Sequence, residues 1–271
     1  MPEWISRDEG RHLFGLDPEG YDAVRPQYPD LIYEFMAEHR ALRPNTATLE
    51  IGAGSGLATR RLIEYGANPI TIIEPDARFA PQLRSLATKA EIHLVQSAFE
   101  DAQLQPRAFD LVAAATSFHW LDPNVAIDKI ARVLKPGGYV ALWWNVLGIQ
   151  GRDDAFHDAT VALLEDLAVS PSGAPNTIPF ALDRAARVEQ FAQSGLFAPV
   201  ECAETRWTLV LNAAQIGTLY GGFSHIQRLQ APERAALLEQ LMVIARTQFG
   251  GTVERNITSV IYLARRLSRA R

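Results

Sequence analysis

Three glycines in the stretch LEIGAGSG, residues 49–56, have the spacing of a ligand-binding turn. Gly52, Gly54 and Gly56 remove side chains where the chain must bend sharply and where a ligand must touch the backbone. The helical pattern that follows would present its unpaired N–H groups at the same place. The stretch therefore predicts a site that binds polar groups of a small ligand through the main chain.

An acidic residue at the end of the next apolar segment narrows the choice of ligand. Glu74, in the stretch IIEPD of residues 72–76, stands 22 positions after Gly52. A carboxylate about 20 residues beyond such a glycine turn accepts hydrogen bonds from ribose hydroxyls. We infer a ligand that contains a ribose and an adenine, with the alternative that Glu74 only caps the helix after it.

Two other nucleotide ligands fit the turn less well. A nicotinamide dinucleotide site has the spacing G-x-G-x-x-G/A, whose last small residue lets the helix pack closely on the strand. Leu57 holds that position here, so an NAD-linked dehydrogenase is disfavoured. No lysine follows the turn as it does in a P-loop, which disfavours a nucleoside triphosphate.

The segments that must position this turn alternate between short apolar runs and amphipathic stretches. The apolar runs predict strands, buried on both faces, at residues 47–51, 69–73, 91–95, 109–115 and 138–144. Helical patterns lie between them, and an amphipathic helix within residues 29–42 precedes the first strand. This alternation predicts an α/β fold with a mostly parallel, doubly wound sheet. The ligand is then expected outside the carboxyl ends of the strands.

Five motifs in order, LEIGAGSG, IIEPD, QSAFED, FDLVAAATSFHWLD and RVLKPGG, resemble those of the class I S-adenosylmethionine-dependent methyltransferases. The chain looks most like a bacterial small-molecule branch, methyltransferase type 11-like, that begins Y-x-x-x-R-P-x-Y-P, here YDAVRPQYP at residues 21–29. The resemblance continues to TSVIYLARR and covers nearly the whole chain. It implies a Rossmann-like seven-stranded sheet whose last strand is antiparallel, with residues 199–211 and 252–264 as the sixth and seventh strands.

The resemblance assigns the cofactor S-adenosylmethionine, with S-adenosylhomocysteine as its product, to the glycine turn. The backbone of Gly52, Ala53 and Gly54 would face the methionine part of the cofactor. The carboxylate of Glu50 and the carbonyl of Thr116 would lie near its ammonium group. The side chains of Tyr21 and Arg25 would lie at its carboxylate. Arg25 suits this role because a guanidinium can bind both carboxylate oxygens, and its alternative is a surface ion pair. Glu74 would hold the ribose hydroxyls.

The same resemblance places the adenine beside the peptide of Ala98 and Phe99, with the Phe99 ring at its edge. Many relatives have an aspartate where this chain has Ala98. The adenine amino group therefore needs another acceptor, and Glu100 is the candidate.

One side chain is a candidate for catalysis. His119 follows the fourth predicted strand, where substrate and sulfonium are expected to meet, and it can act as a general base. The alternative to a general base is that His119 is a packed, hydrogen-bonded histidine. Methyl transfer asks little of side chains beyond alignment, which alone can supply roughly 7–11 kcal/mol. Asp153 and His157 share a helical face, but two ligands without a third do not predict a metal site.

The expected domain organisation is a single methyltransferase domain over residues 1–271. Within it we expect N-terminal cap helices at residues 1–45, a cofactor-binding core at 46–145, and helical substrate-lid insertions at 146–198 and 213–249. The lids and the N-terminal segment would form an apolar, partly aromatic pocket for a small organic substrate.

Composition and charge bear on the remaining choices of function. The net charge of -5 and the pI of about 5.7 do not suit a nucleic-acid partner. No stretch approaches the length of a membrane span, and the single Cys202 does not indicate an oxidising compartment, so a cytoplasmic location is expected. Two functions remain. One is methyl transfer to an oxygen, nitrogen or carbon nucleophile of a small metabolite (EC 2.1.1.-), and the other is binding of S-adenosylmethionine without methylation, in a structural, regulatory or non-methylating catalytic role. The sequence predicts no particular oligomeric state.

Overall fold

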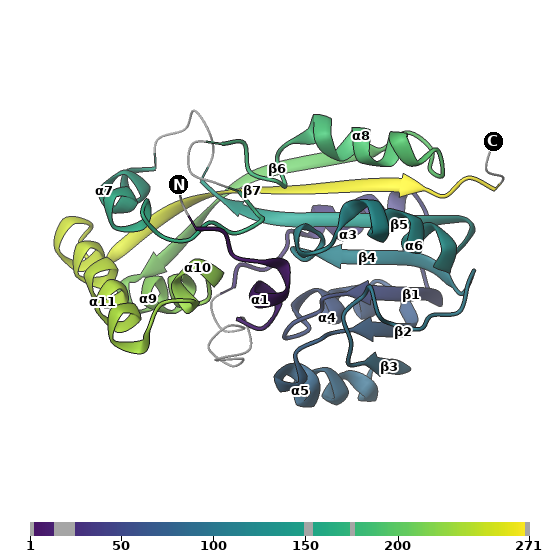
Figure 1. The fold of residues 1–271 in the computed structure, drawn as a ribbon, viewed down its shortest axis with the longest axis horizontal. Helices are drawn as coiled ribbons and strands as arrows, with labels where there is room; N and C mark the ends of the chain where they lie inside the picture. The colour runs from purple at the N-terminus through teal and green to yellow at the C-terminus, as the bar shows by residue number, and fades with distance from the viewer. Residues whose placement is uncertain (1–2, 14–24, 149–153, 174–176, 269–271) are drawn as a thin grey trace. The chain divides into compact units, whose positions relative to one another are not determined.

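A seven-stranded sheet runs through the part of the chain that the structure, a computed structural model, describes: residues 3–13, 25–148, 154–173 and 177–268. The strand order is β3-β2-β1-β4-β5-β7-β6 (Figure 1). The strands are β1 (Thr46–Ile51), β2 (Ala67–Ile73), β3 (Ile92–Val95), β4 (Phe109–Ala115), β5 (Leu134–Leu147), β6 (Glu201–Asn212) and β7 (Thr252–Arg265). The α-helices are α1 (Arg7–Arg11), α3 (Asp30–Glu38), α4 (Leu57–Glu64), α5 (Ala80–Ser85), α6 (Pro123–Val133), α7 (Ala155–Leu164), α8 (Arg184–Ser194), α9 (Ala213–Gly221), α10 (Ser224–Gln227) and α11 (Ala231–Gln248).

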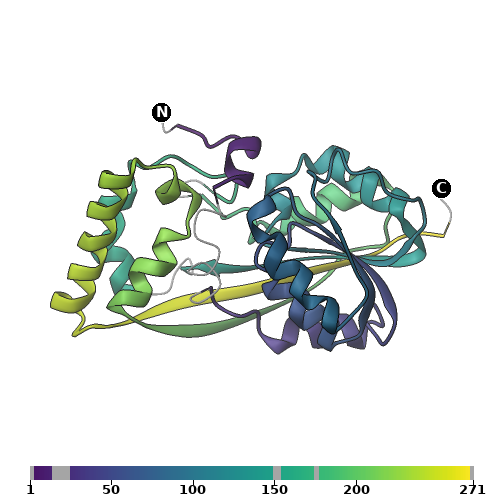
Figure 2. The same ribbon diagram turned by 90° about the horizontal axis from the view of Figure 1, so that it is seen from below.

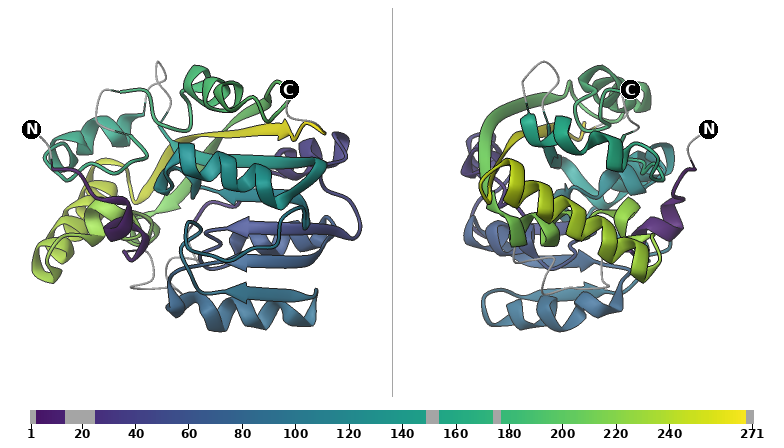
Figure 3. Two further views of the ribbon diagram at one scale, coloured as in Figure 1. Left: turned by 45° about the vertical axis from the view of Figure 1, so that its right-hand side comes forward. Right: turned by 90° about the vertical axis from the view of Figure 1, so that its left-hand side faces the viewer.

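The first five strands are parallel, which confirms the mostly parallel, doubly wound sheet that the sequence predicts. β1 pairs in parallel with β2 and β4, and further parallel pairs join β2 to β3 and β4 to β5 (Figure 3). Residues 111–114 of β4 are fully buried, as expected of a central strand in a sheet that is covered on both faces. The carboxyl ends of β1, β2 and β4 therefore meet at one edge of the sheet.

The last strand is antiparallel, as the resemblance implies. Near the start of β5, Gly137 N donates a hydrogen bond to Arg266 O at 3.1 Å, and just past the end of β5, Gly148 N donates to Asn256 O at 2.9 Å. Residue numbers therefore rise along β5 while they fall along β7. The observed bounds of β6 and β7 lie within two residues of the predicted ones.

The chain divides into two compact units. The core unit comprises residues 27–144, 180–204 and 260–271, and the helical unit comprises residues 1–26, 145–179 and 205–259. Strands β5, β6 and β7 each contribute residues to both units. The helix α8 lies inside the lid predicted for residues 146–198, but it belongs to the core unit and packs beside α6.

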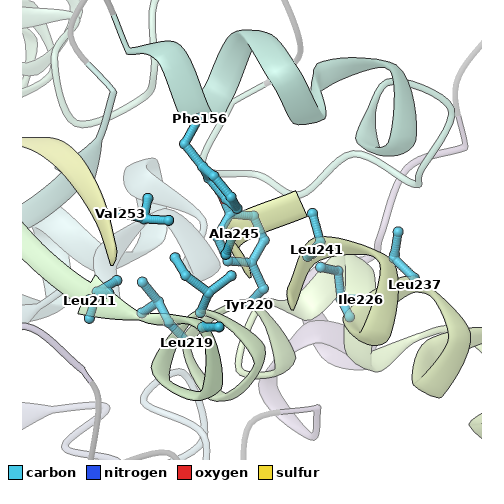
Figure 4. Packing of buried hydrophobic residues seen from close by; sticks show 11 residues of the cluster. Phe156, Leu211, Leu219, Tyr220, Ile226, Leu237, Leu241, Ala245 and Val253 are labelled. Carbon is cyan, nitrogen blue, oxygen red and sulfur yellow. The ribbon is translucent and has the colours of Figure 1, made fainter. Parts of the chain in front are cut away.

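The helical unit has a hydrophobic core of its own. α9 and α11 lie side by side, and α7 packs against α11 (Figure 2). Figure 4 shows the cluster of buried hydrophobic side chains that forms this core, and Phe156 of α7 inserts into it. The ring centroid of Phe156 lies 6.0 Å from that of Tyr220 and 5.4 Å from that of Phe249. Helices are thus present within both predicted insertions, residues 146–198 and 213–249. Their role as substrate lids stays a prediction.

A buried ion pair joins three elements of the helical unit. Asp154 caps α7 by accepting a hydrogen bond from His157 N at 3.0 Å. Its other oxygen accepts a hydrogen bond from Arg255 Nε of β7 at 2.9 Å. Arg255 also donates to the hydroxyl of Tyr220 on α9. All three side chains are buried, so the two charges compensate each other away from water.

Candidate functional site

The glycine turn follows β1 and is held against the segment after β4. Gly52 has a φ of +69°, and a Cβ there would lie 2.7 Å from the Cβ of Ser117. The Ser117 hydroxyl donates to the carbonyl of Ile51 at 2.5 Å. Position 52 therefore requires glycine both for its backbone conformation and for this close approach. The sequence does not predict this contact of Ser117, because a serine shortly after a strand carries no distinctive signal.

Glu74 directly follows β2, and its carboxylate binds the glycine turn. Its Oε2 accepts a hydrogen bond from Gly54 N at 2.7 Å, and its Oε1 accepts one from Asp76 N at 2.9 Å. Glu74 is 6% exposed, and burial raises its pKa to about 7 although the two N–H groups favour the charged form. The two parts of the site that residue spacing predicts, Gly54 and Glu74, are thus in direct contact.

Glu50 lies in β1 just before the turn and has no exposed surface. Burial raises the pKa of its carboxyl to about 7, and the Thr59 hydroxyl offsets part of this rise. The nearby Glu74 raises the Glu50 pKa further because the two carboxylates repel each other. Glu50 therefore occupies the buried side of the turn, and its contact with the amino group of a methionine stays a prediction.

The loop after β3 is held by a lysine of α6. Lys129 Nζ donates to the carbonyls of Glu100 at 2.8 Å and Ala102 at 2.7 Å, and it lies 5.1 Å from the centre of the Phe99 ring. Phe99 is buried, and the carbonyl of Ala98 closes a turn by accepting a hydrogen bond from Ala102 N. The loop that the resemblance places beside the adenine is therefore an ordered turn. Lys129 was missed because its partners are backbone carbonyls, which no sequence motif marks.

Thr116 has a left-handed backbone conformation directly after β4. Its φ is +51°, which a β-branched residue rarely adopts. Its N–H donates to Trp143 O at 2.8 Å, and its hydroxyl lies 2.8 Å from the Tyr28 hydroxyl, within hydrogen-bonding distance. Strained backbone of this kind gathers at functional sites. Tyr28 belongs to the motif YDAVRPQYP, so the motif itself was a signal that could have found it.

Two residues predicted at the methionine carboxylate belong to the N-terminal segment. Tyr21 lies outside the described residues. Arg25 is part of the helical unit, where its Nη2 donates to Gly222 O at 3.3 Å and its guanidinium carbon lies 5.8 Å from the centre of the Phe223 ring. The role of both residues at the carboxylate stays a prediction.

His119 is a buried ring near the carboxyl ends of β4 and β5. It lies in the short helical turn Phe118–Trp120 and is 5% exposed. Its Nδ1 accepts a hydrogen bond from Trp144 Nε1 at 3.1 Å, since an indole can only donate. The ring also packs against Trp120 and Phe180. Because Nδ1 accepts the hydrogen bond from Trp144, the ring is neutral and carries its hydrogen on Nε2. The buried, hydrogen-bonded position agrees with the alternative of a packed histidine.

The described residues include no group of three or more histidine, cysteine, aspartate or glutamate side chains able to hold a metal ion, and Asp153 lies outside them. Among the helices of the described ranges, none has the length and apolar character needed to cross a membrane.

Comparison with known proteins gives relatives of this chain. The family described as methyltransferase domain matches residues 49–142. An uncharacterized methyltransferase of Schizosaccharomyces pombe is 29% identical over 258 residues, which cover 92% of this chain and 95% of that protein. An uncharacterized methyltransferase of Mycobacterium tuberculosis is 35% identical over 140 residues, which cover 52% of this chain and 55% of that protein.

Solved structures share the fold. Phosphoethanolamine N-methyltransferase 2 of Haemonchus contortus, in complex with phosphomonomethylethanolamine and S-adenosylhomocysteine, gives a TM-score of 0.58 at 13% identity, over 97% of this chain and 60% of that chain. The [4+2]-cyclase SpnF gives a TM-score of 0.59 at 17% identity, over 99% of both chains. At such low identities the likeness shows the fold alone.

The strand order, the antiparallel last strand and the carboxylate bound to the glycine turn define a Rossmann-like protein of the methyltransferase type. The match over residues 49–142 and the relatives name the methyltransferase domain family. The chain has the fold of the class I S-adenosylmethionine-dependent methyltransferases, whose cofactor is S-adenosylmethionine.

Proposed function

We propose that this protein transfers the methyl group of S-adenosylmethionine to an oxygen, nitrogen or carbon nucleophile of a small metabolite. The observation that supports the proposal most is the hydrogen bond from Gly54 N to the Glu74 carboxylate, because it joins the two residues that the sequence predicts for an adenosine site. A small acceptor and a cytoplasmic setting are part of the proposal. They rest on the acidic net charge and the single cysteine of the sequence.

The residues around the glycine turn fit an adenosine-containing cofactor. The Glu74 carboxylate has lone pairs left for ribose hydroxyls, and the turn leaves main-chain groups uncovered by side chains. In this proposal Ala53 and Gly54 face the methionine part, the peptide of Phe99 borders the adenine, and the carbonyl of Thr116 accepts a hydrogen bond from the ammonium.

The reaction needs alignment more than acid–base chemistry. When bound, S-adenosylmethionine supplies an electrophilic methyl group on its sulfonium. The chain's own residues must align the acceptor and exclude water. The rings of His119, Trp144 and Phe180 pack together near the carboxyl ends of β4 and β5, and in this proposal these aromatic rings border the acceptor. In this proposal His119 is the side chain that meets the acceptor, and it orients the acceptor without removing a proton.

Calorimetric titration tests the cofactor. S-adenosylmethionine and S-adenosylhomocysteine are expected to bind and NAD is not. Glu74→Ala should weaken S-adenosylmethionine binding about tenfold or more with an intact circular dichroism spectrum, since hydrogen bonds to a charged group are lost. Glu91→Ala, at an exposed residue before β3, is the control and should bind normally. Binding of NAD alone would overturn the proposal, and normal affinity in Glu74→Ala would remove that residue from the site.

A second function keeps cofactor binding without methyl transfer. A [4+2]-cyclase has the same fold, so the fold does not decide the reaction. Incubation with methyl-labelled S-adenosylmethionine and a metabolite extract separates the two functions. Label in a small molecule supports methylation, whereas cofactor binding with no labelled product supports the second function.

A further inference from the structure

Arg187 is a buried cation of α8. Only 4% of its surface is exposed, and its guanidinium carbon lies 3.3 Å from the centre of the Phe180 ring. Nε and Nη1 are buried, and within the described part of the chain no atom accepts a hydrogen bond from them. Burial lowers the Arg187 pKa to about 10, so the group still carries its charge at neutral pH.

The polar groups near Arg187 have other partners. Asp183 caps α8 by accepting a hydrogen bond from Ala186 N at 3.0 Å, and it acts on Arg187 only through its electric field. The Tyr262 hydroxyl donates to the carbonyl of Ala181 at 2.7 Å. An apolar side chain at position 187 would pack here without the free-energy cost of an unpaired buried charge. A ligand anion is the partner that would offset this cost.

Arg187 lies beside the aromatic rings that border the proposed substrate site. The Phe180 ring on which it stacks also contacts the ring of Trp144 at 5.8 Å and the ring of His119 at 6.1 Å. All four residues belong to the core unit. One aromatic ring therefore connects the guanidinium to the end of the sheet where the methyl acceptor is proposed to bind.

We propose that Arg187 binds an anionic group, a carboxylate or a phosphate, of the methyl acceptor. Stacking on Phe180 uses the face of the guanidinium and leaves the N–H groups in its plane for an oxyanion, which they can bind in pairs. The inference rests on the proposed function and narrows it, because the acceptor is then an acidic small metabolite.

Thermal denaturation with small probes tests this site. The protein loaded with S-adenosylhomocysteine is titrated with succinate, with inorganic phosphate, and with succinamide, which has the shape of succinate without its charge. At least one of the two anions should raise Tm, and succinamide should not. The anion that acts distinguishes a carboxylate from a phosphate. No shift with either anion, or an equal shift with succinamide, overturns the proposal.

Variants of α8 assign the response to Arg187. Arg187→Met keeps most of the side-chain volume, so its Tm without probe should equal or exceed that of the wild type, while the Kd for the anion rises about tenfold or more. Arg184→Met, at an exposed residue of the same helix, is the matched control and should respond as the wild type does. A wild-type response in Arg187→Met overturns the proposal. Arg187→Lys keeps the charge without the planar fork and should bind the anion more weakly than the wild type, and equal binding counts against the guanidinium.

The two proposals can fail separately. The same titrations are repeated on protein without S-adenosylhomocysteine. If that compound does not bind, the proposed function fails, and the anion response of the free protein and of Arg187→Met still decides whether position 187 is an anion site.

Discussion

At the scale of single residues, two buried carboxyls at the glycine turn, Glu50 and Glu74, make stability depend on pH. Burial raises the Glu50 pKa from 4.5 to about 7 in the folded protein. The unfolded chain loses this proton at a lower pH than the folded protein does. The contribution of Glu50 to the free energy of unfolding therefore falls as pH rises from about 4.5 to about 7, and it stays lowered above that range. Glu74, whose pKa is also raised to about 7, adds to the same slope. His225, whose pKa is lowered to about 4 by burial, contributes in the opposite direction between about pH 4 and 6.5.

Glu50→Gln is expected to flatten part of that slope. The amide has nearly the same shape and no charge to bury. The free energy of unfolding of the variant at about pH 8 should exceed that of the wild type by on the order of 1–3 kcal/mol, with the difference shrinking toward about pH 4. Urea denaturation across this range measures it. Glu34→Gln, at an exposed residue of α3, is the control. A constant difference at every pH would contradict the assignment.

His119→Asn separates an orienting role from proton removal. Asparagine can still accept the hydrogen bond from Trp144 Nε1, but it has no counterpart of the Nε2–H. Turnover should fall about tenfold with unchanged cofactor affinity, and the pH–rate profile should keep its shape. If the acidic limb of the profile disappears, His119 removes a proton. Full activity would mean that the ring serves packing only.

Local spacing explains which of these residues could be predicted. Gly54 and Glu74 were predictable because each follows the carboxyl end of its own strand, and parallel strands bring their carboxyl ends together. Ser117 and Arg187 were not, because their importance depends on neighbours far away in the sequence. The backbone approach of Ser117 to Gly52 is one example, and the stacking of Arg187 on Phe180 beside His119 is another.

At the scale of elements, α6 holds the loop after β3 through one side chain. Lys129→Met removes both hydrogen bonds to this loop. S-adenosylmethionine affinity should fall about tenfold in calorimetry, because a loop that is no longer held must be ordered on binding. Lys135→Met, which removes a partly exposed ion pair with Asp110, is the matched control and should change affinity little. If the two variants bind S-adenosylmethionine with equal affinity, Lys129 does not stabilise the loop proposed to border the adenine.

The start of β5 differs from the one that the local sequence pattern predicts. Pro136, Gly137 and Gly138 are typical of a turn, so the predicted strand begins at residue 138, whereas β5 begins at Leu134. Gly137 N donates to Arg266 O, and Arg266 N donates to Gly138 O. This pairing with the end of the chain extends the strand through residues that locally favour a turn. By contrast, β4 has the predicted bounds, residues 109–115, because its apolar run is buried on both faces.

At the scale of the whole molecule, the helical unit depends on one buried ion pair. Asp154→Asn retains a cap for α7 but leaves the Arg255 charge uncompensated, at a cost of about 3–5 kcal/mol. Hydrogen exchange resolved by peptide should show faster exchange in α7, α9 and β7, with β1 to β4 unchanged. Asp158→Asn, at an exposed residue of α7, is the control. A uniform loss of protection throughout the chain would contradict an effect confined to the helical unit.

The fold class could be predicted from the alternation of strands and helices, but the division into units could not. The helical unit combines the N-terminal residues with two later segments, 145–179 and 205–259. No local pattern indicates which helices group together. The helix α8 has an ordinary amphipathic sequence, and only its packing beside α6 places it in the core unit.

The position of β7 has a consequence for synthesis of the chain. β7 lies between β5 and β6 in the sheet, yet it is the last strand in the sequence. A nascent chain that has not yet released residues 252–265 from the ribosome therefore has no strand to join β5 to β6, and both keep an unpaired edge. Unpaired strand edges of this kind are prone to pair with other chains until β7 is synthesised. Because β7 contributes to both units, its arrival would allow both to close in the same step.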